Sequence, residues 1–162
     1  MDFSHFYLSP LGRILLSGDG ERLTGLWFEG QKDVPEGLGP EKQLPVFDSA
    51  CRWLNLYFDG ERPDFLPPLM PRGTAFQRAV WDILLAIPYG GTITYGQIAR
   101  TLAREMGKPR MSAQAVGSAV GRNPISIIIP CHRVVGADGG LTGYAGGLER
   151  KAALLALEQA KR

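Results

Sequence analysis

Residues 94–121 read TYGQIARTLAREMGKPRMSAQAVGSAVG, and this stretch predicts two helices joined by a short basic connector. Thr94 and Gln97 form a capping box that begins the first helix. Ser112 caps the second helix, which runs from Ala113 to about Gly121 and contains almost no large side chain. A helix, a short connector and a helix make the outline of a helix-turn-helix. The small side chains of the second helix fit either tight helix packing or a close approach to a groove of nucleic acid.

The sequence on the carboxyl side of this motif predicts a buried segment, a loop and a last helix. The apolar run ISIII at residues 125–129 is typical of a short buried strand or extended segment, and Pro130 ends it. Six glycines follow between residues 136 and 147, which predict a mobile loop. The final helix then extends from Leu148 to about Ala160.

On the amino side, a further helix and a small α/β unit are predicted. The helix begins at a capping box of Thr74 and Gln77 and stops at Pro88. Further upstream, residues 12–17 and 23–29 predict two strands joined by a hairpin turn. The helix that comes next carries its apolar stripe on Phe47, Ala50, Cys51, Leu54 and Phe58.

Composition and charge both change near residue 71. Residues 63–71 contain four prolines in nine positions, which predicts a linker. We therefore expect a small α/β N-terminal domain with linker, residues 1–71. The expected C-terminal domain, residues 72–162, is mostly α-helical and contains a helix-turn-helix (winged-helix-like) DNA-binding motif.

The net charge of +2 hides an asymmetry between these two parts. Residues 1–71 have six basic and eleven acidic side chains, a net charge of −5, whereas residues 72–162 have twelve and five, a net charge of +7. Such a basic half indicates a polyanionic partner, although solvated faces that merely differ in charge give the same pattern.

Several classes of protein are excluded by composition. No apolar run approaches the ~18 residues that a membrane span needs. Asp2 stands where a secretion signal is basic, and two cysteines are too few for a disulfide framework in a chain of 162 residues. We expect an intracellular, cytoplasmic protein without a membrane association. With two cysteines and two histidines in the whole chain and no pair at a zinc-binding spacing, no metal is expected.

Cys131 is the residue that most strongly indicates chemistry. It follows a buried run and is followed by His132 and Arg133, and an imidazole or a cation beside a thiol favours the reactive thiolate. Glu158 lies on the flank of the apolar face of the last helix, and a carboxylate there needs a partner, for which His132 is the candidate. Lys151 lies on much the same side of that helix, so a solvated Glu158 stays open.

The hexapeptide PCHRVV at residues 130–135, preceded by Asn123-Pro124, resembles the signature of the O6-alkylguanine-DNA alkyltransferases. The similarity extends from the FQRAVW stretch at residues 76–81 to Glu158, and the N-terminal half fits the family in outline only. The resemblance implies a single-turnover repair protein that transfers an alkyl group irreversibly from O6 of guanine to its own cysteine. The acceptance of O4-alkylthymine stays open.

By matched position, the resemblance assigns four catalytic residues. Cys131 is the acceptor, His132 is its base through a water, and Glu158 orients His132. Asn123 ties the second helix of the helix-turn-helix to the active site. No cofactor is implied, because the protein itself accepts the alkyl group.

The resemblance also implies how DNA is held. The partner is double-stranded DNA carrying O6-alkylguanine, the base is flipped into a pocket, and the helix from Ala113 enters the minor groove. Tyr95 presses on the phosphate. The DNA-contacting residues are Tyr95, Gln114, Ala115, Gly117, Ser118, Arg122 and Arg133, and the pocket is lined by Tyr144, Ala145 and Gly146. We expect a monomer, and cooperative binding on DNA stays open.

This sequence departs from the family pattern at the second helix. Gln114 stands where the better-known members have an arginine that fills the gap left by the flipped base. Gly121 and Arg122 are transposed relative to the usual order before Asn123, and the connector after Tyr95 is several residues longer than in some relatives. The zinc ligands of some animal members are absent.

Three alternatives compete with alkyl transfer. A thiol hydrolase built on Cys131, His132 and Glu158 would turn over an ester without DNA. A non-catalytic relative that binds alkylated DNA has tryptophan in place of the cysteine, which this sequence retains. A winged-helix regulator would leave Cys131 without a role.

Overall fold

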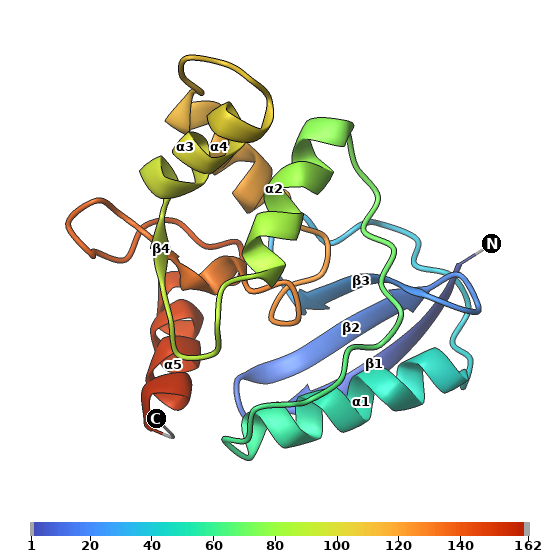
Figure 1. The fold of residues 1–162 in the computed structure, drawn as a ribbon. Helices are drawn as coiled ribbons and strands as arrows, with labels where there is room; N and C mark the ends of the chain where they lie inside the picture. Colours follow the sequence, from blue (N-terminus) through green and yellow to red (C-terminus); the bar gives the residue numbers. More distant parts are fainter. Residues whose placement is uncertain (1, 161–162) are drawn as a thin grey trace.

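Three antiparallel strands form a meander at the N-terminal end of the computed structural model, which describes residues 2–160 (Figure 1). The strands are β1 (Phe3–Ser9), β2 (Gly12–Gly18) and β3 (Leu23–Phe28). Helix α1 (Pro45–Phe58) packs across the sheet. The two predicted strands are confirmed as β2 and β3. The sequence did not predict β1, because its apolar and polar residues do not alternate cleanly.

The buried stripe of α1 differs from the predicted one. The side chains that it buries are Val46, Phe47, Ala50, Trp53, Leu54 and Tyr57. Cys51 and Phe58 are only half-buried. A helix with aromatic residues on adjoining positions offers two apolar stripes about one residue apart, and only packing against the sheet selects between them.

The second half of the chain is mostly helical, as predicted (Figure 1). It contains α2 (Ala75–Leu85), α3 (Tyr95–Glu105), α4 (Ala113–Gly121) and α5 (Leu148–Ala160). Both predicted capping boxes are present, and Ser112 accepts a hydrogen bond from Ala115 N at the start of α4. Helices α3 and α4 pack together as the helix-turn-helix, and the indole of Trp81 joins α2 to α4 through a 2.8 Å bond to Ala119 O. Residues 161–162 of the predicted C-terminal domain lie outside the described residues.

A second, very small sheet was not predicted. Strand β4 (Ile93–Thr94) pairs in parallel with β5 (Val134–Val135). Between α4 and β5 lies the short 3₁₀ helix η1 (Cys131–Arg133). Two-residue strands carry too little pattern to be recognised in a sequence. Their pairing nevertheless places the end of the PCHRVV segment next to the start of α3.

The apolar run at residues 125–129 is buried, as expected, but it forms a turn instead of a strand. Ile127 has φ 68°, a left-handed conformation that is strained for a β-branched residue. A run of β-branched residues favours a strand by propensity, and tertiary contacts override that preference here.

The free edge of β3 joins the two halves of the chain. Leu23 exchanges backbone hydrogen bonds with Pro68 and Met70 in the proline-rich segment, and Leu26 exchanges bonds with Pro124 and Ser126. The segment predicted as a linker is therefore partly laid along the sheet. The turn that precedes Cys131 is fixed to the same strand, so the N-terminal sheet supports the candidate site directly.

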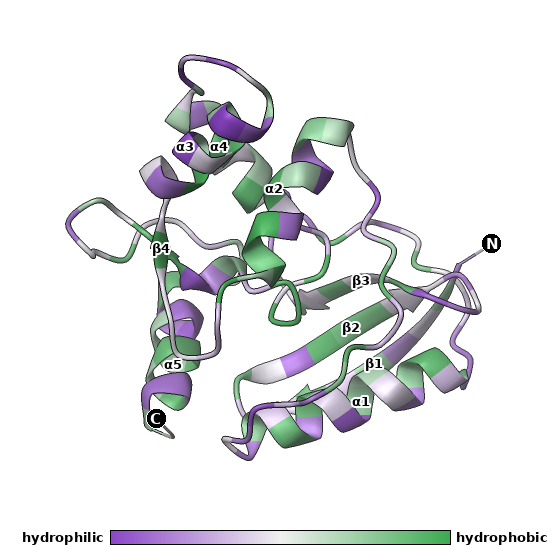
Figure 2. Ribbon diagram, viewed as in Figure 1, coloured by the Kyte–Doolittle hydropathy of each residue, from purple (hydrophilic) through white to green (hydrophobic). Residues whose placement is uncertain are grey.

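Hydrophobic residues concentrate on β2 and β3, whereas the connector between α3 and α4 is hydrophilic (Figure 2). The apolar core runs through both halves, from Leu16 and Phe47 to Ile98 and Ile129. Within residues 2–160, no helix is long and apolar enough to cross a membrane.

Candidate active site

Cys131 begins η1 directly after Pro130, and its side chain is buried. The turn before it is held by Asn123, which follows the end of α4. The Asn123 amide donates to Ile129 O at 2.8 Å and its carbonyl oxygen accepts from Ile125 N at 3.0 Å. One asparagine side chain therefore closes the turn that carries the thiol and joins it to the helix-turn-helix, as the sequence predicted for it.

The surroundings of the Cys131 side chain keep its thiol protonated in the free protein. Burial raises the pKa of Cys131 to about 11, although a hydrogen bond from Asn123 and the positive charge of Lys151 act in the opposite direction. A nucleophilic thiolate at this position therefore needs a base to take the proton. The two groups that favour the anion are already in place to stabilise it.

A narrow cavity of about 170 Å³ opens in front of Cys131. It collects residues from α3, α4 and the glycine-rich loop, which are far apart in the sequence. Its lining residues are Tyr95, Gly117, Val120, Gly121, Asn123, Ser126, Cys131, Gly143, Tyr144 and Ala145. The cavity brings the candidate nucleophile, two aromatic rings and the inner face of α4 to one place.

Two of the three predicted pocket residues, Tyr144 and Ala145, line this cavity, and Gly146 does not. A Cβ added to Gly146 would lie 2.7 Å from the Tyr144 ring and 2.9 Å from the Phe28 ring. Gly146 lines a neighbouring hollow together with Tyr144 and Ala145, and its place in the base pocket stays a prediction. Its glycine is needed because the rings of Tyr144 and Phe28 lie against the backbone there.

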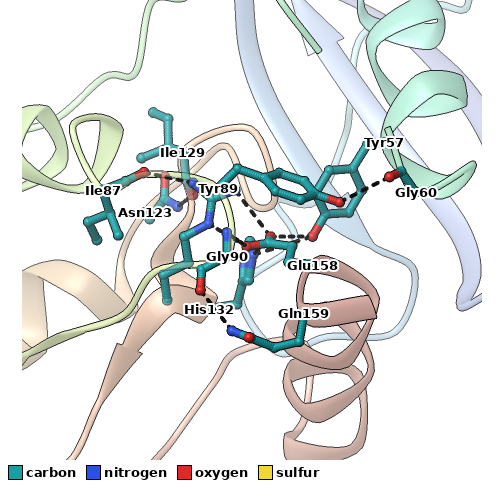
Figure 3. A network of polar contacts seen from close by, with 11 residues as sticks. Tyr57, Gly60, Ile87, Tyr89, Gly90, Asn123, Ile129, His132, Glu158 and Gln159 are labelled. Atoms are coloured by element: carbon teal, nitrogen blue, oxygen red, sulfur yellow. Dashed lines mark hydrogen bonds and ion pairs between the residues drawn. The ribbon is translucent and has the colours of Figure 1, made fainter. Parts of the chain in front are cut away.

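His132 and Glu158 meet in the interior, as the sequence predicted. Both side chains are fully buried, and His132 Nε2 lies 2.6 Å from Glu158 Oε2 (Figure 3). The carboxylate also accepts from Tyr57 Oη at 2.6 Å and from Gly90 N at 3.1 Å. A solvated Glu158, the alternative left open by the sequence, is excluded by this burial.

Arg133 completes the set of donors around Glu158. Its Nε lies 2.7 Å from Oε1 and its Nη2 3.1 Å from Oε2, while Nη1 donates to Ile87 O at 2.9 Å. The guanidinium is thus held inside the protein. The expectation that Arg133 contacts DNA is wrong, because all its nitrogens donate to interior acceptors and its side chain is almost fully buried.

The protonation states of this cluster follow from burial and charge. Burial alone raises the pKa of Glu158, but hydrogen bonds from His132 and Arg133, together with the charge of Arg133, outweigh it and hold that pKa at about 2. Burial lowers the pKa of His132, so the imidazole is neutral at pH 7. An ionised carboxylate accepts only, and His132 therefore donates from Nε2.

This tautomer leaves His132 Nδ1 with a free lone pair. The atom is buried and has no hydrogen-bond partner within the described part of the chain. A neutral imidazole whose far nitrogen is fixed by a carboxylate is the arrangement of a general base. Glu158 and His132 thus form a buried pair of this kind, and His132 directly follows Cys131 in the chain.

The predicted DNA-contacting residues of α4 form its outer row. Gln114, Ala115, Ser118 and Arg122 are exposed, three of them spaced four residues apart on one face. Gly117 is half-buried, and a Cβ there would lie 3.8 Å from the ring of Tyr95. Tyr95 itself accepts a hydrogen bond from the Thr142 hydroxyl at 3.2 Å, so this residue spans from α4 to the glycine-rich loop.

Two residues of the cluster were missed by sequence reasoning. Tyr57 lies in α1, 75 residues before His132, and no local pattern connects the two. Lys151 is fully buried and its ammonium donates to Thr142 O at 2.8 Å. Burial lowers the pKa of Lys151. Its position on α5, on the same side as Glu158, was the available signal.

Among residues 2–160, no group of three or more His, Cys, Asp or Glu side chains is arranged to hold a metal ion.

Comparisons with known proteins match nearly the whole chain. Residues 75–160 match the family model described as "6-O-methylguanine DNA methyltransferase, DNA binding domain", and residues 3–71 match "6-O-methylguanine DNA methyltransferase, ribonuclease-like domain". The chain is 50% identical over 153 residues to the methylated-DNA–protein-cysteine methyltransferase of Methanosarcina acetivorans, which covers 93% of this chain and 94% of that protein. The corresponding protein of Haemophilus influenzae is 47% identical over 156 residues, 95% of this chain and 84% of that one.

Solved structures agree with these sequence matches. The O6-methylguanine methyltransferase of Mycobacterium tuberculosis superposes with a TM-score of 0.86 at 46% identity, covering 100% of this chain and 95% of that one. A structure of the M. tuberculosis OGT in complex with DNA superposes with a TM-score of 0.84 at 45% identity, covering 98% and 94% of the two chains.

Proposed function

The chain belongs to the 6-O-methylguanine DNA methyltransferase family, and from this premise we propose that Cys131 is the residue that accepts the alkyl group. The protein is a methylated-DNA–protein-cysteine methyltransferase that acts in direct-reversal DNA repair. The observation that carries the assignment of Cys131 is its burial at the floor of the cavity, next to a neutral imidazole fixed by Glu158.

The proposed reaction begins with proton transfer from the thiol. His132 Nδ1 takes the Cys131 proton through a bridging water, and Asn123 and Lys151 stabilise the thiolate that forms. The sulfur attacks the alkyl carbon, so that the S–C bond forms as the C–O6 bond breaks. The electron pair of the broken bond remains on the guanine, which regains its carbonyl and takes up a proton at N1. The thioether has no route back to thiolate, so each molecule acts once.

We propose that α4 enters the minor groove of the DNA and binds it there. Gln114, Ala115, Ser118 and Arg122 are exposed, and Gly117, Val120 and Gly121 of the same helix line the cavity. Small side chains on such a helix permit a close approach to the groove. A lesion on O6 faces into the duplex, so the base must rotate out of the stack to reach Cys131. Gln114 would occupy the vacated space, and Tyr95 would contact the phosphate of the rotated nucleotide.

The remaining assignments complete the proposal. The substrate is duplex DNA carrying O6-alkylguanine, the protein is a cytoplasmic monomer, and no cofactor takes part. Residues 1–71 form the α/β domain that supports the site. Residues 72–162 form the catalytic and DNA-binding domain, with Gly143, Tyr144 and Ala145 closing over the base.

Intact mass spectrometry after incubation with O6-methylguanine duplex tests the proposal. We expect one added methyl group per protein, which peptide mapping places on Cys131. The number of lesions repaired should equal the number of protein molecules. Repair of many lesions by each molecule, or a methyl group on Cys51, would overturn the assignment.

A further inference from the structure

Tyr57 reaches the buried pair of Glu158 and His132 from the N-terminal half of the chain. It lies near the end of α1, is fully buried, and donates from its hydroxyl to Glu158 Oε2 at 2.6 Å (Figure 3). The same hydroxyl lies 3.4 Å from His132 Nε2. Glu158 Oε2 therefore accepts from the phenol and the imidazole as well as from Arg133 Nη2, and Tyr57 contacts both Glu158 and His132.

The phenol hydrogen is a permanent part of this contact. Burial and the charge of Glu158 raise the pKa of Tyr57 far above its ordinary range, so the group stays protonated at every pH at which the protein works. Because Glu158 is ionised and accepts only, the Tyr57 proton lies in the bond to the carboxylate.

The ring of Tyr57 is fixed as firmly as its hydroxyl. It stacks on Trp53 at a centroid distance of 5.2 Å and meets the edges of Phe58, Tyr89 and His132 at 5.4, 6.2 and 6.4 Å. Packing on all sides leaves the phenol one position, so α1 sets where the carboxylate oxygen can lie. This anchor for the Glu158 carboxylate comes from the N-terminal half of the chain, outside the predicted C-terminal domain.

We propose that Tyr57 is a positioning residue for alkyl transfer: its hydroxyl holds the Glu158 carboxylate against His132 and limits how strongly that carboxylate supports a protonated imidazole. The inference rests on the proposed roles of Cys131 and His132. It gives the N-terminal sheet unit a part in the chemistry, through one hydrogen bond that crosses between the two halves of the chain.

The direction of the effect on His132 follows from charge. A donor on Oε2 draws negative charge away from the imidazole, and its removal favours the imidazolium. The charged groups that act on His132 stay in place in a Tyr57→Phe variant: Glu158 and Lys151 from α5, and Arg133 from η1. Removal of the hydroxyl alone should therefore raise the pKa of His132.

The test is Tyr57→Phe, compared with Tyr89→Phe as a matched control. Both changes remove one phenol oxygen from the same aromatic cluster, but the Tyr89 hydroxyl lies 3.5 Å from Gly60 O and does not contact Glu158. Single-turnover transfer is measured with O6-methylguanine duplex and with free O6-benzylguanine from about pH 5 to 9, a range around the ordinary histidine pKa. Duplex affinity and thermal unfolding are measured for each variant.

We expect Tyr57→Phe to slow transfer about tenfold with both substrates, the scale of a hydrogen bond to a charged group, and to move the acid limb of the rate profile to higher pH. Tyr89→Phe should match the unchanged protein in both respects. Because the chain has two histidines, NMR titration can follow the His132 signals directly. The His132 titration should move up in Tyr57→Phe and stay unchanged in Tyr89→Phe.

Two results overturn the inference. One is an unchanged His132 titration and pH profile in Tyr57→Phe, and the other is a loss of rate that Tyr89→Phe reproduces. A failure of the proposed function looks different, because then the unchanged protein itself would not alkylate Cys131. If Tyr57→Phe is destabilised, the NMR titration below its unfolding temperature still decides the question.

Discussion

Glu158 and Gln114 are both predicted to serve alkyl transfer, yet their surroundings are opposite. Glu158 is fully buried, and its two oxygens accept hydrogen bonds from α1, from the segment after α2 and from η1. Gln114 lies on the outer face of α4, is exposed, and its side chain makes no hydrogen bond within residues 2–160. The fold supplies all the hydrogen-bond partners of Glu158, whereas we propose that the partner of Gln114 is DNA.

This difference separates two classes of effect. A change in the buried cluster alters the nucleophile, so it should act on every substrate, including a free base. A change on the outer row of α4 should act only where a duplex has to be bound and a base rotated out. Transfer measured with O6-methylguanine duplex and with free O6-benzylguanine distinguishes the two.

Cys131→Ala should have the largest effect. Without the sulfur, no alkyl transfer is possible with either substrate, while the exposed row of α4 and duplex affinity stay unchanged. Single-turnover assays and gel-shift titrations measure the two quantities. Cys51→Ala is the matched control, because that half-buried thiol lies in α1 and should be dispensable. Residual transfer by Cys131→Ala would show a different acceptor.

Glu158→Gln should slow transfer roughly 10²–10⁴-fold, the usual contribution of a general base, and equally with both substrates. The amide keeps the shape of the carboxylate but does not support a protonated His132. Duplex affinity is the control and should not change. If the slowing were confined to duplex DNA, Glu158 would belong with the DNA-contacting face and the comparison would fail.

The buried pair of Glu158 and His132 should also contribute to the stability of the fold, and this contribution should be lost in acid. The pKa of Glu158 is about 2 in the folded protein against an ordinary 4.5, so the stability it contributes is fully present above about 4.5 and is lost as pH falls toward 2. Burial lowers the pKa of His132 below its ordinary 6.5, so the unfolded chain binds that proton first and stability already falls below 6.5. We expect a loss on the order of 2 kcal/mol from the carboxylate.

Urea unfolding at several pH values measures this dependence. Glu158→Gln should have a lower free energy of unfolding than the unchanged protein near neutral pH. The difference between the two free energies should decrease as the pH falls. If this difference in free energy of unfolding stays constant down to the lowest pH, Glu158 stabilises the fold by packing and not by its charge.

The sequence predicted the grouping of Cys131, His132 and Glu158. It did not predict the further hydrogen bonds to Glu158. The PCHRVV segment and the apolar face of α5 together identified Cys131, His132 and Glu158 as partners. Arg133 was assigned to DNA because a basic side chain in a sequence carries no information on its direction, and the 3₁₀ turn of η1 points it inward. Tyr57 was missed because its contact with Glu158 spans 101 residues and depends on how α1 packs.

The fold shows a similar division. Capping boxes and hairpin signals are local, and they placed α2, α3, β2 and β3 correctly. The turn at residues 125–129 is decided by the side chain of Asn123 and by backbone pairing with Leu26. Those non-local contacts hold Ile127 in a conformation that its own propensity opposes.

Gln114→Ala should have a moderate effect on duplex repair and little on the free base. Extrusion of a nucleotide costs a few kcal/mol, and a side chain in the vacated space offsets part of that cost. We expect about tenfold slower repair of duplex, a loss of roughly 1.4 kcal/mol on the scale of one or two hydrogen bonds. Gln43→Ala, the same change at an exposed residue before α1, is the control for a change that merely alters the surface. An equal loss with free O6-benzylguanine would mean that Gln114 supports the active site.

Gln114→Arg should have the smallest effect and the most specific one. The guanidinium is longer than the amide, is flat and charged, and can stack in the duplex and bond to the orphaned base. We expect duplex binding to tighten a few-fold and repair at low protein concentration to quicken, with no change for the free base. If the new cation also contacts a phosphate, log–log plots of affinity against salt should steepen by about 0.9. Gln114→Lys separates the two contributions, because a lysine adds the charge without the flat stacking surface. If duplex affinity rises equally in both variants, the effect comes from charge alone. Residue 114 would then lie outside the duplex interior.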